Sequence, residues 1–175
     1  MALAPLYYLV PEELPYVGIP RWSGLVIFIT AILSFEVVRL RMGITFLGLR
    51  PHEAEGIASY VWTAAGMTLA LWVFPHDIAS VSVVGMALVD PLAGEIRRVR
   101  GEGPLSLGAP AAAYAAIAAC VLWAFAERGW LIIAVLSIVG AASAVAAERY
   151  KVRRVDDDFL MMIVPGLLMW ALSEI

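Results

Sequence analysis

Residues 82–101, SVVGMALVDPLAGEIRRVRG, decide how this chain folds. An apolar run ends there in Asp90 and Pro91, and a basic cluster follows. A charged side chain at the centre of a membrane helix costs about 2.5–3.5 kcal/mol, so Asp90 is a functional-site candidate. Pro91 removes a backbone donor and biases Asp90 away from helical angles, so we expect the helix to break or kink here and leave polar backbone that lines a cavity. A solvated helix end at the membrane interface is the alternative.

The composition of the chain is that of a membrane protein. Its 175 residues are 62% hydrophobic and only 15% charged. The mean hydropathy of +0.87 lies above the range of soluble domains. We therefore expect a single membrane-embedded domain over residues 1–175. The one cysteine, Cys120, lies in an apolar run and cannot form an intrachain disulfide.

Apolar segments separated by polar loops predict an all-α, polytopic bundle of about six transmembrane helices. The expected spans cover residues 23–40, 56–74, 78–95, 109–126, 130–147 and 159–173. Residues 1–22 are apolar but interrupted by prolines and lack the basic start of a signal peptide, so we expect a short interfacial or re-entrant segment there. The twelve residues from Ile78 to Val89 cover only ~18 Å of a ~30 Å hydrocarbon core, so the third helix must continue past Asp90.

Basic residues gather in the loops after the first, third and fifth spans. They are Arg39, Arg41 and Arg50; Arg97, Arg98 and Arg100; and Arg149, Lys151, Arg153 and Arg154. The opposite side holds only Arg21 and Arg128. An excess of Lys and Arg in short loops marks the cytoplasmic side, so we expect both termini outside the cell. The polar clusters at residues 50–55, 90–100 and 148–158 then lie on the cytoplasmic face, most simply of a prokaryotic cell membrane.

Three aspartates at residues 156–158 follow a basic run at residues 149–154. Carboxylates bind Mg²⁺ through one or two oxygens, while guanidinium groups bind phosphate oxygens in pairs. Together with Asp90, these side chains supply the groups that a nucleotide-phosphate reaction needs. A solvated, charge-balanced loop is the alternative.

Other polar residues have simpler interpretations. Glu53 begins the second span, where an acid stabilises a helix N-terminus, and capping alone explains it. His52 has no His or Cys partner at ligand spacing, which argues against a zinc site. The chain has neither a Walker phosphate loop nor a Gly-x-Ser-x-Gly motif. Glu36 and Arg39, spaced i and i+3 in the first span, are placed to form an ion pair.

Four short motifs follow one another along the chain. They are Arg50-x2-Glu53-x2-Gly56-x3-Tyr60, Phe74-Pro75-x2-Ile78-Ala79, Asp90-x2-Ala93-x4-Arg98-x2-Gly101, and Glu148 followed by Asp156-Asp157-Asp158. In this order they resemble the CTP-dependent lipid kinases, the family of dolichol kinase, phytol kinase and the CTP-using diacylglycerol kinase, which is related to phosphatidate cytidylyltransferases. The chain departs from that family at Arg97, where the family has Gly, at Asp158-Phe159, where it has Asn-Leu, and at Gly103-Pro104-Leu105-Ser106, where it has Lys-Thr-x-Glu-Gly.

The resemblance implies a membrane-embedded kinase that transfers the γ-phosphate of CTP to a long-chain lipid alcohol such as a polyprenol, with Mg²⁺ as cofactor. It implies Asp90, Asp157 and Asp158 for the metal, Asp90, Glu53 and Glu148 for catalysis, and Arg50, Arg98, Arg100, Arg153 and Arg154 for the nucleotide phosphates. The expected partners are CTP, the lipid alcohol and membrane lipids, with no nucleic acid, and a homodimer stays open. A CDP-lipid synthase of the same fold and a non-catalytic membrane bundle or transporter are the alternatives.

Overall fold

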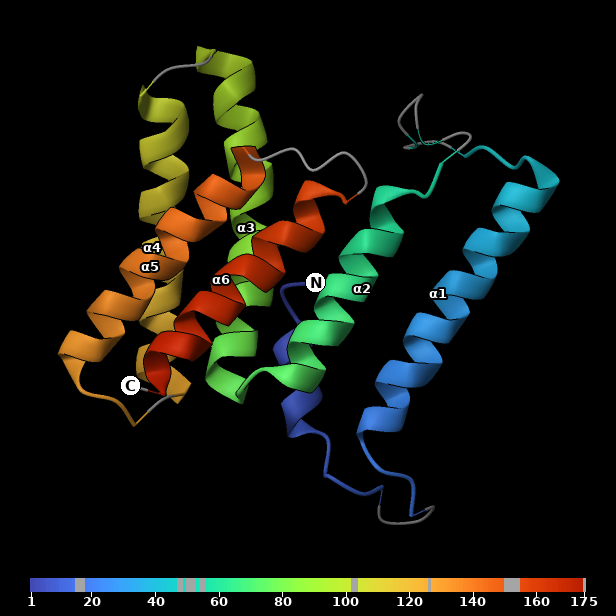
Figure 1. Cartoon of the computed structure of the whole chain (residues 1–175), viewed down its shortest axis with the longest axis horizontal. Helices are drawn as coiled ribbons and strands as arrows, with labels where there is room; N and C mark the ends of the chain where they lie inside the picture. Colours follow the sequence, from blue (N-terminus) through green and yellow to red (C-terminus); the bar gives the residue numbers. More distant parts are fainter. Residues whose placement is uncertain are drawn as a thin grey trace.

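The computed structural model shows a chain of packed helices (Figure 1). The elements are η1 (Ala4–Leu9, a 3₁₀ helix), α1 (Trp22–Met42), α2 (Ser59–Val73), α3 (His76–Arg100), α4 (Pro104–Phe125), α5 (Trp130–Arg149) and α6 (Asp157–Ser173). The structure describes residues 1–14, 18–46, 49, 53, 56–101, 104–125, 127–149 and 155–174, and within them every side chain except those of residues 100, 104 and 105. The expected all-α fold is confirmed.

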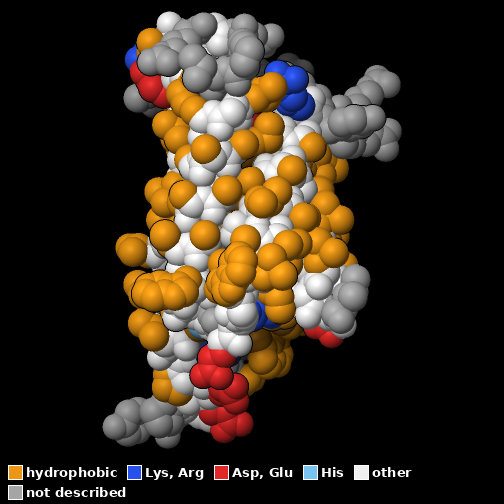
Figure 2. Space-filling view, turned by 90° about the vertical axis from the view of Figure 1, so that its left-hand side faces the viewer, with side chains coloured by type: hydrophobic (Ala, Val, Ile, Leu, Met, Phe, Trp, Pro, Cys, Tyr) orange, Lys and Arg blue, Asp and Glu red, His pale blue; other side chains and the backbone are white. Residues whose placement is uncertain are grey.

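Within the part of the chain that the structure describes, four helical segments are long and apolar enough to cross a membrane. They are Trp22–Met42, His76–Val99, Ser106–Phe125 and Trp130–Arg149. At ~1.5 Å per residue, the 15 residues of α2 and the 17 of α6 extend about 22 and about 26 Å, somewhat less than a ~30 Å hydrocarbon core. Figure 2 shows hydrophobic side chains along most of one face of the molecule, with charged side chains toward its two ends. The architecture is that of a helical membrane bundle.

The α3 helix passes through Pro91 without a break. The expected helix break is therefore wrong, the alternative of a kink at Pro91 stays a prediction, and the expected continuation of this helix beyond Asp90 is confirmed. Prolines also lie inside α4 and α6, at Pro110 and Pro165. The physical reason is packing, because α3 lies against α4, α6 and α2. Neighbouring helices and small local adjustments satisfy the backbone groups that a proline frees within a membrane helix.

Helices α3 to α6 form the closely packed part of the bundle. Tyr114 of α4 is fully buried and lies against Gly85 of α3 and Gly140 of α5. A Cβ atom at Gly85 would lie 2.5 Å from Cε2 of Tyr114, and one at Gly140 would lie 3.2 Å from Cε1 of the same ring. Glycine at both positions lets the backbones of α3 and α5 approach this ring closely. In contrast, α1 packs mainly on α2, and only 17% of the residues in its apolar 18-residue stretch are buried inside the protein.

The alternation of the helices collects the polar ends at one side of the bundle. The C-terminal ends of α1, α3 and α5 lie there together with the N-terminal ends of α2, α4 and α6 (Figure 1). The sequence motifs at Glu53, Glu148 and residues 156–158 therefore share one end of the molecule.

The residues before α1 fold back onto the bundle. Helix η1 packs against α3, and the Tyr8 hydroxyl donates to the carbonyl of Leu71 in α2 at 3.2 Å. Arg21, just before α1, donates to the carbonyls of Tyr8 and Val10 and lies over the rings of Tyr7 and Tyr8. These contacts attach the N-terminal segment to both α1 and α2.

Candidate functional site

A cavity of about 430 Å³ lies among α2, α3 and α6, and two carboxylates line it. Its lining residues are Met1, Ala2, Thr63, Met86, Ala87, Asp90, Pro91 and Asp158. Asp90 and Asp158 come from two motifs far apart in the sequence, and both side chains are half-buried. The structure therefore brings together, at one cavity, two of the three residues assigned to a metal ion. The rest of the lining is largely apolar, so the cavity has one acidic wall.

Two hydroxyl groups of α2 hold the acidic N-terminus of α6. The Ser59 hydroxyl donates to Oδ2 of Asp156 at 2.6 Å, and Thr63 Oγ1 donates to Oδ2 of Asp158 at 2.8 Å. Asp156 is also the N-cap of α6, where its Oδ1 accepts from the backbone N–H of Asp158 at 3.2 Å. The sequence analysis did not single out Ser59 and Thr63. Both lie on one face of α2 at i, i+4 spacing, but no signal in the sequence joins them to an acidic motif 97 and 95 residues away.

The three aspartates at the start of α6 concentrate negative charge. Each offers a carboxylate oxygen, and these oxygens lie within 4.8 Å of one another. Burial, followed by the neighbouring Asp156 and Asp158, raises the pKa of Asp157 to about 6. Asp156 accepts hydrogen bonds at both carboxylate oxygens, and Asp158 accepts one from Thr63, so all three aspartates are candidate cation ligands. Hard carboxylate oxygens are the donors that Mg²⁺ prefers, so the donor set fits this ion.

Glu148, in the last turn of α5, is a buried acid at the same end of the bundle. Its side chain forms an ion pair with Arg97 of α3, with 2.6 Å between Arg97 Nη2 and Glu148 Oε1. Asp90 lies close enough to act on Glu148 electrostatically. Arg98 points the other way: its side chain is 78% exposed and pairs with Glu95 on the same helix at 2.9 Å. The structure thus brings Arg97, rather than Arg98, to an acidic residue of the site.

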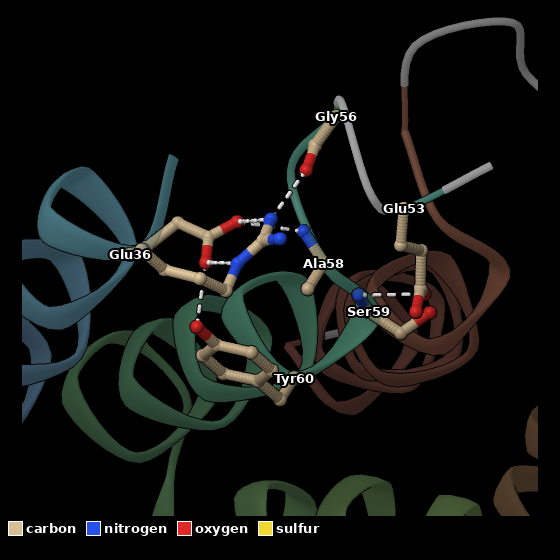
Figure 3. Close-up of polar contacts among 7 residues, drawn as sticks. Glu36, Glu53, Gly56, Ala58, Ser59 and Tyr60 are labelled. Atoms are coloured by element: carbon tan, nitrogen blue, oxygen red, sulfur yellow. Dashed lines mark hydrogen bonds and ion pairs between the residues drawn. The ribbon is translucent and has the colours of Figure 1, made fainter. Parts of the chain in front are cut away.

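Glu53 is buried, and its contact with the bundle is at the start of α2. Oε1 of Glu53 accepts from the backbone N–H of Ser59 at 3.0 Å (Figure 3). This bond satisfies one of the free N–H groups of the first helical turn, which is the capping role that its position in the sequence already explained. A role for Glu53 as a catalytic base stays a prediction.

A buried ion pair joins α1 to the segment that leads into α2 (Figure 3). Arg39 donates to Glu36 through Nε at 2.6 Å and through Nη2 at 2.8 Å, which confirms the expected pairing. Nη2 of Arg39 also donates to the carbonyl of Gly56 at 2.6 Å. Glu36 accepts from the backbone N–H of Ala58 at 2.9 Å and from the hydroxyl of Tyr60 at 2.5 Å. The network fixes the residues on either side of Ser59, which in turn contacts the acidic cluster.

Four of the arginines assigned to the nucleotide phosphates have no described side chain. Arg50, Arg153 and Arg154 lie outside the described residues, and the side chain of Arg100 is likewise not described. Their assignment to the nucleotide stays a prediction.

The fold and the cavity define a class. Over its described residues this is a helical protein, with four helices long and apolar enough to cross a membrane and a carboxylate-lined cavity between α2, α3 and α6. No family model matches the chain, and no curated protein or solved structure does so either. The resemblance to CTP-dependent lipid kinases therefore rests on its four motifs.

Proposed function

We propose that this protein is a membrane-embedded kinase that transfers a phosphate from a nucleotide to a long-chain lipid alcohol, with Mg²⁺ as cofactor and CTP as the donor that the sequence resemblance implies. The observation that carries the proposal is the meeting of Asp90 and Asp158 at one cavity with an otherwise apolar lining. An acidic wall suits a metal and a hydroxyl group, and an apolar wall suits the chain attached to that hydroxyl.

The side chains of the site divide the work. Asp90, Asp157 and Asp158 would hold Mg²⁺, and when bound this ion supplies neutralisation of phosphate charge. Thr63 orients the carboxylate of Asp158 through its 2.8 Å hydrogen bond. Glu148 is the better candidate for the base that accepts the proton of the alcohol, because its carboxylate lies near Asp90, whereas the carboxylate of Glu53 caps α2. Arg98 and Arg100, in the last turn of α3, together with Arg50, Arg153 and Arg154 would bind the nucleotide phosphates.

We further propose that all six α-helices cross the membrane, with the acidic end in the cytoplasm. Exposed tryptophans support the position of the opposite membrane interface, because tryptophan gathers at the headgroup level. They are Trp22 and Trp130 at the starts of α1 and α5, and Trp72 and Trp123 at the ends of α2 and α4. All four lie on the side away from the acidic cluster. The basic loops at the other end favour the cytoplasm for that side.

The test is to incubate the purified protein with CTP and Mg²⁺, once with mixed polyprenols and once with a lipid phosphate such as phosphatidate, and to identify both products. Release of CDP together with a polyprenyl phosphate from the polyprenols supports the kinase. Release of pyrophosphate together with a CDP-lipid from the lipid phosphate supports the CDP-lipid synthase instead, and no turnover with either acceptor refutes both enzymes. Asp90→Asn should abolish most turnover, while the matched control Glu95→Gln, which changes an exposed acid on the same helix, should retain it.

A further inference from the structure

Residues 1–9 lie along the seam between α2 and α3. At one end, Met1 and Ala2 line the same cavity as Asp90. At the other end, the Tyr8 ring packs on His76, the first residue of α3, with 4.2 Å between ring centroids, and the Tyr8 hydroxyl bonds the carbonyl of Leu71. The segment therefore runs from the far end of the two helices to the carboxylate cavity. Both helices pack more extensively on α6 than on each other, which leaves this seam for the segment to fill.

The segment has two faces that repeat every three residues, as a 3₁₀ helix requires. Leu3, Leu6 and Leu9 are 74%, 52% and 78% exposed. Ala4 and Tyr7, on the opposite side, pack against the hydrophobic core. None of the six residues of η1 is buried. The segment is thus a thin apolar cover, with one leucine face toward the surroundings and one face toward the bundle.

The two ends of this cover are held unequally. Its Tyr8 end is fixed by the hydrogen bond to Leu71 and by Arg21, which donates to the Tyr8 carbonyl and lies over the Tyr7 ring. At the cavity end, Ala4 packs against the core, and the hydrogen bond of Met1 is a local turn in which its carbonyl accepts from the Ala4 N–H at 2.7 Å. Such a strap can release its cavity end while it stays attached near Tyr8.

We propose that residues 1–9 are a displaceable lid over the binding site for the apolar chain of the acceptor. An amphiphile with a hydroxyl head reaches the cavity laterally through the α2–α3 seam, its head next to Asp90 and its chain where Met1 to Leu6 lie in the free protein. The ligand can take the place of the lid because both are apolar: an isoprenoid chain replaces an apolar face of residues 1–9. The identity of the head group rests on the proposed function, whereas the location of the chain rests on the seam itself.

The lid can be tested without catalysis. Spin labels would be placed at Ala2→Cys and Trp130→Cys in a Cys120→Ser background, and their separation measured in lipid nanodiscs without CTP or Mg²⁺. Geranylgeraniol, a C20 isoprenoid alcohol, should produce a second, altered distance that grows with its concentration. The control pair Leu9→Cys and Trp130→Cys reports on the attached end and should stay unchanged.

A second variant tests which end of the lid moves. Tyr8→Phe removes the 3.2 Å hydrogen bond to Leu71 and nothing else from the ring. Because this bond is present whether the cavity end is closed or displaced, half-displacement should need the same concentration of geranylgeraniol as in the unchanged protein. A large shift in that concentration would overturn the attachment at Tyr8, and an unchanged distance at saturating alcohol would overturn the lid.

The remaining outcomes separate this proposal from the kinase. Equal displacement by the hydrocarbon phytane would overturn recognition of a hydroxyl head. Displacement by geranylgeraniol in a protein that shows no turnover with CTP would support the lid and refute the kinase. Turnover with CTP in a protein whose lid does not move would support the kinase and refute the lid.

Discussion

Thr63→Val removes one hydroxyl group from the candidate site and leaves the shape of the side chain almost unchanged. In the structure, Thr63 Oγ1 donates to Oδ2 of Asp158 at 2.8 Å, and both side chains are half-buried. A hydrogen bond to a charged group contributes about 1.5–3 kcal/mol. Because water reaches a half-buried carboxylate and replaces part of that bond, we expect the lower end of the range, which is about a tenfold change.

The measurement is the Mg²⁺ concentration that gives half-maximal CTP turnover. Loss of a group that orients a metal ligand commonly weakens metal binding about 10- to 100-fold, which agrees with the expected tenfold rise for Thr63→Val. Thr68→Val is the matched control, because Thr68 lies on the same helix and its buried Oγ1 has no hydrogen-bond partner in the described part of the chain. Thr68→Val should leave the Mg²⁺ dependence unchanged and keep or raise the melting temperature. Equal Mg²⁺ dependence in the two variants would refute the role of Thr63 in orienting Asp158.

Three other changes have expected outcomes. Arg39→Met leaves a buried carboxylate without its cation and should lower the free energy of unfolding by about 3–5 kcal/mol in a denaturant titration, whereas the exposed control Arg41→Met should change it little. Arg97→Ala should lower the melting temperature, because it leaves the buried Glu148 without its cation. Arg98→Ala should leave the melting temperature unchanged and raise the Michaelis constant for CTP about ten- to a hundredfold. The reverse pattern would exchange the roles of the two arginines. Because the pKa of Asp157 is raised from 3.8 to about 6, the folded state binds its proton more tightly than the unfolded state. Stability without metal should therefore fall as the pH rises through about 6, and a melting temperature in EDTA that does not change between pH 5 and pH 7 would contradict this.

Hydropathy and charge predicted the helices because both depend on the chain locally. The span expected at residues 23–40 lies inside α1, and the spans expected at residues 109–126 and 130–147 overlap α4 and α5 closely. The i, i+3 spacing of Glu36 and Arg39 was likewise enough to predict their pairing, since both lie on one helix.

Contacts between distant parts of the chain were harder to predict. Pro91 alone predicts a break, but the helices packed around α3 keep it continuous. Neighbours such as Arg97 and Arg98 differ by about 100° around the helix, and the sequence does not say which one faces α5. The partnership of Thr63 with Asp158 depends on how α2 lies against α6, which no local pattern records. The same holds for the position of residues 1–9 beside the cavity.

The pairing of Glu36 with Arg39 has a consequence for how the protein is made. The two side chains lie one turn apart on α1, so their contact forms as soon as this helix forms. Their other partners, Gly56, Ala58 and Tyr60, are synthesised later. We therefore expect α1 to enter the lipid bilayer with its two charges already neutralising each other, so that its insertion does not have to wait for α2.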